Sequence, residues 1–115
     1  MVSAREHFQQ VRARPGMHGV PNRRPDIVIA YVLGYDAATE YRLLDGFAAW
    51  LNRRRGGDGR TNFTWDGELM AAIFGVDRAR RVPYSTLSEE DPERLLETLY
   101  ESLDAFLSEV EGVEG

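Results

Sequence analysis

Residues 91–110 read DPERLLETLYESLDAFLSEV, and this stretch decides the fold class. Asp91, Pro92 and Glu93 form a strong helix start, because they supply an N-cap, a proline at the first helical position and an acid in the first turn. Eight apolar residues then recur at helical spacing on one face: Leu95, Leu96, Leu99, Tyr100, Leu103, Phe106, Leu107 and Val110. The pattern predicts a long amphipathic helix that ends near residue 111, followed by a frayed tail over 112–115.

The N-terminal part of the chain predicts two further helices. Ser3 and Glu6 form a capping box, so the first helix should begin there and run to about residue 12. Residues 25–38 begin with Pro-Asp, which suits a helix start, and are apolar nearly all round. Such a helix is expected at the centre of a small bundle. A strand is the competing prediction for Ile27–Leu33, because this run is rich in β-branched residues.

The middle of the chain predicts two more helices. Thr39 would cap a helix over residues 40–54, whose apolar residues form one stripe: Leu43, Leu44, Phe47, Trp50 and Leu51. Thr64 would cap a helix over 65–74, which Gly75 ends. Residues 76–90 are expected to form a longer connection, pinned to the core by Val82, Tyr84 and Leu87.

Together these segments predict an all-α fold, a compact bundle of about five helices in a single domain over residues 1–111. The length of 115 residues suits one domain. Cysteine is absent, which excludes disulfides and thiolate metal sites, and all 14 basic residues are arginine, which excludes a P-loop lysine. The polar start and the lack of a long apolar run predict a cytoplasmic protein that does not enter membranes.

Charge is divided unevenly along the chain. Residues 1–60 carry 10 Arg and 6 acids, and residues 61–115 carry 4 Arg and 13 acids. Four acids recur on one face of the last predicted helix: Glu93, Glu97, Glu101 and Asp104. This row is either a solvated face or a surface that steers a basic protein partner to the molecule.

The positive charge is concentrated on two predicted turns. Arg53, Arg54 and Arg55 precede a glycine-rich stretch and would complement the negative end of the helix before it. Alternatively they form a phosphate-contacting patch, with Arg23 and Arg24 nearby, that binds nucleic acid or a nucleotide. The acidic net charge of −5 and the lack of interleaved exposed aromatics favour a protein partner over nucleic acid.

Two other groups of residues are candidates for partner binding. Arg14 and His18 lie in a Pro- and Gly-containing loop that could present them, although the loop could equally be a helix stop. Asn62, Trp65 and Asp66 surround a predicted helix N-terminus, where an anionic group could dock; the alternative is that they only fix the preceding loop. No spaced set of metal ligands and no dinucleotide-binding motif is present, so no metal or cofactor is expected.

Four motifs resemble those of small uncharacterised bacterial proteins that look like immunity or conflict-system accessory proteins. They are RPGM at 14–17, LGYD at 33–36, GFAAWL at 46–51 and NFTW at 62–65. His18 departs from the aromatic residue that such proteins usually carry after the Met, and the first two motifs lie further apart here. No catalytic residue is implied, and the resemblance favours protein binding.

The sequence therefore predicts a small protein-binding module that engages a basic partner through its acidic helix face. The alternatives are binding of nucleic acid or a nucleotide through the Arg clusters, or a small biosynthetic enzyme using Asp36, Asp66 or His18. A homodimer formed through an apolar face is a further expectation.

Overall fold

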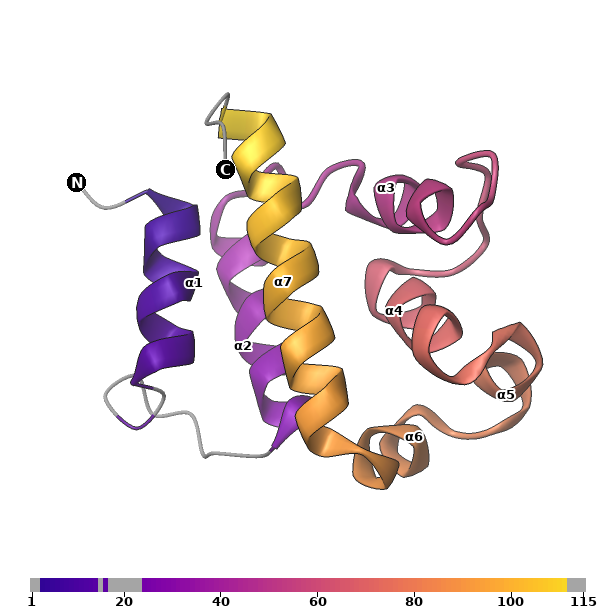
Figure 1. The fold of residues 1–115 in the computed structure, drawn as a ribbon. Helices are drawn as coiled ribbons and strands as arrows, with labels where there is room; N and C mark the ends of the chain where they lie inside the picture. Colours follow the sequence, from indigo (N-terminus) through magenta and orange to yellow (C-terminus); the bar gives the residue numbers. More distant parts are fainter. Residues whose placement is uncertain (1–2, 15, 17–23, 112–115) are drawn as a thin grey trace.

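The computed structural model describes residues 3–14, 16 and 24–111, and these residues form seven helices and no strand (Figure 1). The helices are α1 (Ala4–Ala13), α2 (Pro25–Ala38), α3 (Phe47–Arg54), α4 (Trp65–Phe74), α5 (Val76–Arg81), α6 (Tyr84–Glu90) and α7 (Pro92–Glu111). The all-α prediction is confirmed, and the prediction of about five helices agrees roughly with the seven that the described residues form, since α5 and α6 are short additions. The tail over 112–115 lies outside the described residues.

Helix α7 is the central element of the fold. It contacts α1, α2, α3, α4 and α6, with α1 and α2 on one side and α3, α4 and α5 on the other (Figure 1). Four of its leucines are completely buried: Leu95, Leu99, Leu103 and Leu107. Each contributes about 1.5–3 kcal/mol by leaving water. The predicted apolar face is therefore correct up to its last residue, Val110, which is 60% exposed beyond the packed region.

Residues 25–38 form helix α2, so the strand alternative for Ile27–Leu33 is wrong. The expected central position of this helix is also wrong. Val28, Ile29 and Val32 are buried, whereas Leu33 at the edge of this face is 42% exposed, and Ala30, Gly34 and Ala37 on the opposite face are exposed. The amphipathic α7 occupies the centre instead, because its length lets it contact both halves of the molecule.

The predicted helix start at residue 40 is wrong, because residues 39–46 form a turn and α3 begins at Phe47. The buried Asp36 organises this turn. Its backbone carbonyl accepts the N–H of Tyr41 at 2.9 Å, and its carboxylate Oδ1 accepts the N–H of Leu44 at 3.0 Å. Glu40 and Tyr41 consequently have positive φ angles of 59° and 62°, which a helix does not allow.

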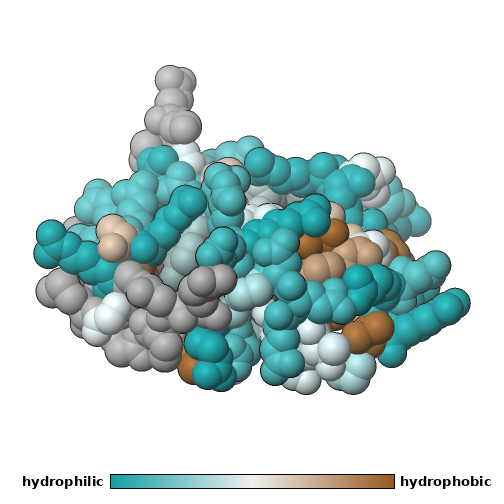
Figure 2. All heavy atoms as spheres, turned by 60° about the horizontal axis from the view of Figure 1, so that its bottom comes forward, coloured by the Kyte–Doolittle hydropathy of each residue, from teal (hydrophilic) through white to brown (hydrophobic). Residues whose placement is uncertain are grey.

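Residues 76–90 form α5 and α6 rather than an extended connection. Gly75, with φ of 94°, separates α4 from α5, a conformation that favours glycine. The predicted anchors do pack on the core, with Leu87 buried and Val82 and Tyr84 partly buried. On the face shown in Figure 2, hydrophobic side chains gather on the side of α4, α5 and α6, and hydrophilic side chains cover most of the rest.

Candidate functional site

The connection between α3 and α4 is folded back onto the end of α3. The side chain of the buried Asn52 accepts the N–H of Gly59 at 2.8 Å, and its backbone carbonyl accepts the N–H of Gly57 at 2.9 Å. A Cβ atom on Gly57 would lie 2.1 Å from Asn52 Oδ1. A larger residue at position 57 would have to displace the Asn52 side chain from its hydrogen bonds, so Asn52 and Gly57 together set the course of the loop.

A fully buried carboxylate, Glu68 of α4, lies beneath this loop. Arg55 donates from Nε to Oε2 at 2.7 Å and from Nη2 to Oε1 at 3.2 Å. Asn52 Nδ2 donates to Oε1 at 3.2 Å, and the Thr61 hydroxyl donates to the same oxygen. Residues from α3, the loop and α4 are thus joined through one side chain.

These contacts keep Glu68 ionised. Burial raises the pKa of Glu68. The hydrogen bonds from Arg55, Thr61 and Asn52, together with the charge of Arg55, lower it by more, so the net shift of the pKa is downward. Hydrogen bonding to Glu68 raises the pKa of Arg55 against the opposing effect of burial. Since both partners are charged, the pair is a bidentate ion pair with a fixed Arg55 geometry.

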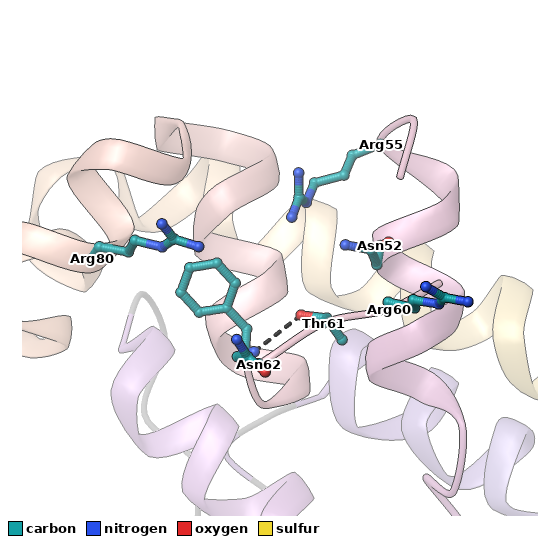
Figure 3. Close-up of a pocket in the computed structure, with 7 residues that line it drawn as sticks. Asn52, Arg55, Arg60, Thr61, Asn62 and Arg80 are labelled. Atoms are coloured by element: carbon teal, nitrogen blue, oxygen red, sulfur yellow. Dashed lines mark hydrogen bonds between the residues drawn. The ribbon is translucent and has the colours of Figure 1, made fainter. Parts of the chain in front are cut away.

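A pocket of about 200 Å³ opens above this ion pair. It is lined by Asn52, Arg55, Arg60, Thr61, Asn62, Phe63 and Arg80. Arg55 and Arg80 enter it from opposite sides and point toward one another, whereas Arg60 extends away from them (Figure 3). We call it the arginine pocket.

Arg80 reaches the pocket from α5 and is held by an aromatic ring. Its guanidinium carbon lies 5.7 Å from the centroid of the Phe63 ring, a cation–π contact. Within the described part of the chain Arg80 forms no ion pair with a carboxylate. Its charge is therefore available to a ligand, unlike that of Arg55, which Glu68 compensates.

A second, more open pocket of about 500 Å³ lies on the other side of α3, lined by Trp50, Arg53, Arg54 and Glu109. The Arg54 guanidinium carbon lies 4.8 Å from the centroid of Trp50. Trp50 Nε1 donates to Glu109 Oε2 at 2.6 Å. This tryptophan pocket, like the arginine pocket, pairs an aromatic ring with an arginine.

The predicted Arg clusters do not form one patch. Arg24 forms an ion pair with Asp26 at 3.0 Å. The start of α2, which follows Arg24, and helix α3 lie in different parts of the molecule (Figure 1). Arg23 lies outside the described residues, as does His18, while Arg14 caps the end of α1. Of the arginines in the predicted clusters that the structure describes, Arg53, Arg54 and Arg55 line the two pockets and Arg24 does not.

The predicted acidic row is divided. Glu93, Glu97 and Glu101 are exposed, as expected. Asp104 is instead half-buried, and it accepts hydrogen bonds from Arg5 of α1 at 2.9 Å and from Gln9 at 3.0 Å. The hydrogen bond with Arg5 lowers the pKa of Asp104 against the effect of burial. Asp104 therefore joins α1 to α7.

The residues predicted around the start of α4 have different roles. Asn62 lines the arginine pocket. Trp65 is buried in the core, and its Nε1 has no hydrogen-bond partner among the described residues. Asp66 is half-buried. Its negative charge helps to raise the pKa of Tyr84, after the larger effect of the burial of Tyr84 and together with the charge of Asp26. The Asp36 carboxylate accepts the Leu44 N–H in the turn after α2. Neither Asp36 nor Asp66 lines the arginine pocket or the tryptophan pocket.

Sequence reasoning missed several members of the site, among them Asn52, Thr61, Glu68 and Arg80. Glu68 had a detectable signal, since it follows Trp65 by three positions and therefore shares the buried face of α4. Arg80 had no such signal in the sequence, because residues 76–90 were expected to form a non-helical connection between two helices. Within the described residues, no cluster of three or more side chains suited to a metal ion is found, and no helix is long and apolar enough to cross a membrane.

Comparison with known proteins identifies no relative. The chain matches no protein-family model, no curated protein and no solved structure. The resemblance to small bacterial immunity-type proteins therefore stays a prediction.

Proposed function

We propose that the protein binds a ligand through a phosphate or carboxylate group held in the arginine pocket. The observation that carries this proposal is the convergence of Arg55 and Arg80 on one small cavity, with Arg80 lacking a carboxylate partner among the described residues. A planar guanidinium group suits bidentate binding of such oxyanions.

The pocket is preorganised for this role. Glu68 and the end of α3 fix Arg55, and the Phe63 ring supports Arg80. Binding therefore costs less side-chain entropy than ordering two free arginines would. A volume of about 200 Å³ is below the roughly 300–1,000 Å³ typical of pockets that enclose a whole ligand. The pocket would hold a charged group and leave the remainder of the ligand outside.

Inorganic phosphate and citrate, followed by NMR titration, test this proposal. We expect Arg80→Gln to weaken phosphate binding about tenfold or more, because it removes a charge-assisted hydrogen bond of roughly 1.5–3 kcal/mol. Arg81→Gln is the matched control, since Arg81 is exposed on the same helix and does not line the pocket. Equal affinities of the two variants for phosphate would refute the proposal.

A second candidate function is binding of a basic protein through the acidic face of α7. Glu97 and Glu101 favour it, because both are exposed and neither pairs with a cation among the described residues. The product of the neighbouring gene is the first partner to test. Binding should weaken with salt and with the Glu97→Gln/Glu101→Gln double change, and indifference to both would exclude an electrostatic role for this face.

A further inference from the structure

The arginine pocket and the tryptophan pocket lie on two sides of the same helical turn. Asn52 and Arg55 line the first, and Arg53 and Arg54 line the second. Since an α-helix with its side chains is about 10–12 Å across, one extended ligand can contact both pockets. We infer that this ligand is a single-stranded nucleic acid, an inference that rests on the oxyanion-binding function proposed above.

Each pocket supplies the same pair of chemical groups. An arginine lies over Trp50 in one and over Phe63 in the other. Single strands are bound without sequence preference by this combination, in which arginines contact the phosphates and aromatic rings stack with bases. The sequence alone gave no sign of interleaved aromatics, because Phe63 and Arg80 are 17 positions apart and meet only in the fold.

The local charge favours a polyanion although the whole chain is acidic. The two pockets contain five arginines (Arg53, Arg54, Arg55, Arg60 and Arg80). Three carboxylates oppose them, Glu68, Glu109 and Asp58 of the loop after α3, which leaves a net charge of +2. Charges further away than the Debye length of about 8 Å are largely screened in physiological salt, so this local balance outweighs the chain's total.

The arrangement favours single strands over duplexes. Stacking on Trp50 requires an unpaired base, and a duplex has none to offer along its length. Glu109 accepts the Trp50 N–H at the same site, where a phosphate would be repelled. A base is therefore expected at the tryptophan pocket and a phosphate at the arginine pocket.

Fluorescence anisotropy with short labelled oligonucleotides of mixed sequence, single-stranded and duplex, tests the inference in a salt series. We expect single strands to bind more tightly than the duplex. Arg80→Gln should weaken binding and make the slope of log affinity against log salt shallower by about 0.7, the value for one lost phosphate contact on a single strand. The control Arg81→Gln should leave the slope unchanged.

Tryptophan fluorescence provides the second readout. Trp65 is buried, so quenching by a bound strand should come from Trp50. Trp50→Phe keeps an aromatic ring in the packed region and should abolish most of the quenching while retaining the circular dichroism spectrum of the folded chain. Unchanged quenching in this variant would overturn the stacking step.

The remaining outcomes separate this inference from the proposed function. If phosphate binds through Arg80 but oligonucleotides do not bind, the inference fails and the oxyanion site stands. If neither binds, both fail. Equal affinity for single strands and duplexes, or tighter binding of a phosphopeptide than of an oligonucleotide, would also overturn the inference.

Discussion

At the residue scale, Glu68 determines how the arginine pocket is built. Its carboxylate is completely buried and receives hydrogen bonds from Arg55, Asn52 and Thr61. A buried charge is costly unless it is paired and hydrogen-bonded, and Glu68 is both. The loop, the end of α3 and the start of α4 therefore depend on the same ionised group.

Glu68→Gln should lower the free energy of unfolding by about 1–3 kcal/mol, because Arg55 loses its charged partner and the buried hydrogen bonds weaken. Urea denaturation measures the change. The control Glu101→Gln alters an exposed position of α7, where we expect a change within about 0.5 kcal/mol. If the two variants were equally stable, the buried network would not stabilise the fold.

The same groups predict loss of stability in acid. The pKa values of Glu68 and Asp104 are lowered in the folded chain. Burial raises that of Glu68, but the hydrogen bonds from Arg55, Thr61 and Asn52 and the charge of Arg55 together outweigh it. The hydrogen bond from Arg5 is the main cause for Asp104. The unfolded chain therefore binds protons first, near the usual carboxylate pKa of about 4. The stabilisation is complete above that pH and is lost as pH falls through the lower folded values.

Thermal unfolding measured between about pH 3 and pH 7, a range that includes the usual carboxylate pKa values, checks this expectation. Arg5→Gln removes the main partner of Asp104 and should make the fall in acid shallower. A steeper fall, or one that begins near neutral pH, would contradict the assignment to these carboxylates.

At the element scale, the turn between α2 and α3 shows a local conformation overruled by the rest of the fold. Leu43, Leu44 and Phe47 have helical spacing, yet residues 39–46 are not helical. Asp36 binds the Leu44 N–H and two successive residues take left-handed conformations. These conformations cost energy that the burial of Leu44 and Phe47 offsets.

Tyr41→Gly should leave the stability unchanged or raise it by up to about 1 kcal/mol, because glycine adopts the left-handed conformation without strain. Tyr41 is 70% exposed, so little packing is lost. Ala37→Gly, at an exposed position of α2, is the control and should cost about 1 kcal/mol. Chemical denaturation compares them, and an equal loss in both would argue against strain at Tyr41.

The sequence was informative where local signals and burial agree. The range 65–74 was predicted to the residue, the segment 25–38 was predicted as a helix with a strand as the alternative for Ile27–Leu33, and α7 was predicted from its cap and leucine pattern. The prediction of a helix over residues 40–46 was wrong, because the hydrogen bond that shapes this turn joins Asp36 to Leu44, eight positions apart. The arginine pocket was not predicted for the same reason. Arg55 and Glu68 are 13 positions apart, and they meet only because the loop between them reverses the direction of the chain.

At the scale of the whole molecule, α7 holds the two sides together. It packs against α1, α2, α3, α4 and α6, whereas α5 has no buried residue. Local stability should therefore differ greatly between them, because regions with few buried contacts open at low free energy. Arg80, which lines the arginine pocket, lies on this least buried helix.

Hydrogen exchange followed by NMR should show this gradient. We expect the amides around Leu99 and Leu103 to exchange only through global unfolding and those of α5 to exchange much faster. Phosphate should slow exchange in α5 selectively if Arg80 binds it. Uniform protection of α5 and α7 would contradict the gradient.

The ion pair between Arg5 and Asp104 also has a consequence for the order of events on the ribosome. The two residues are 99 positions apart, and Arg5 also binds Glu111 through its backbone N–H. At a synthesis rate of about 5–20 residues per second, the part of α7 that packs against α1 is synthesised about 5–20 s after α1. During that interval Phe8 and Val11, both buried in the finished fold, have no α7 to cover them. Pulse-labelled hydrogen exchange during refolding should accordingly find α1 protected no earlier than α7.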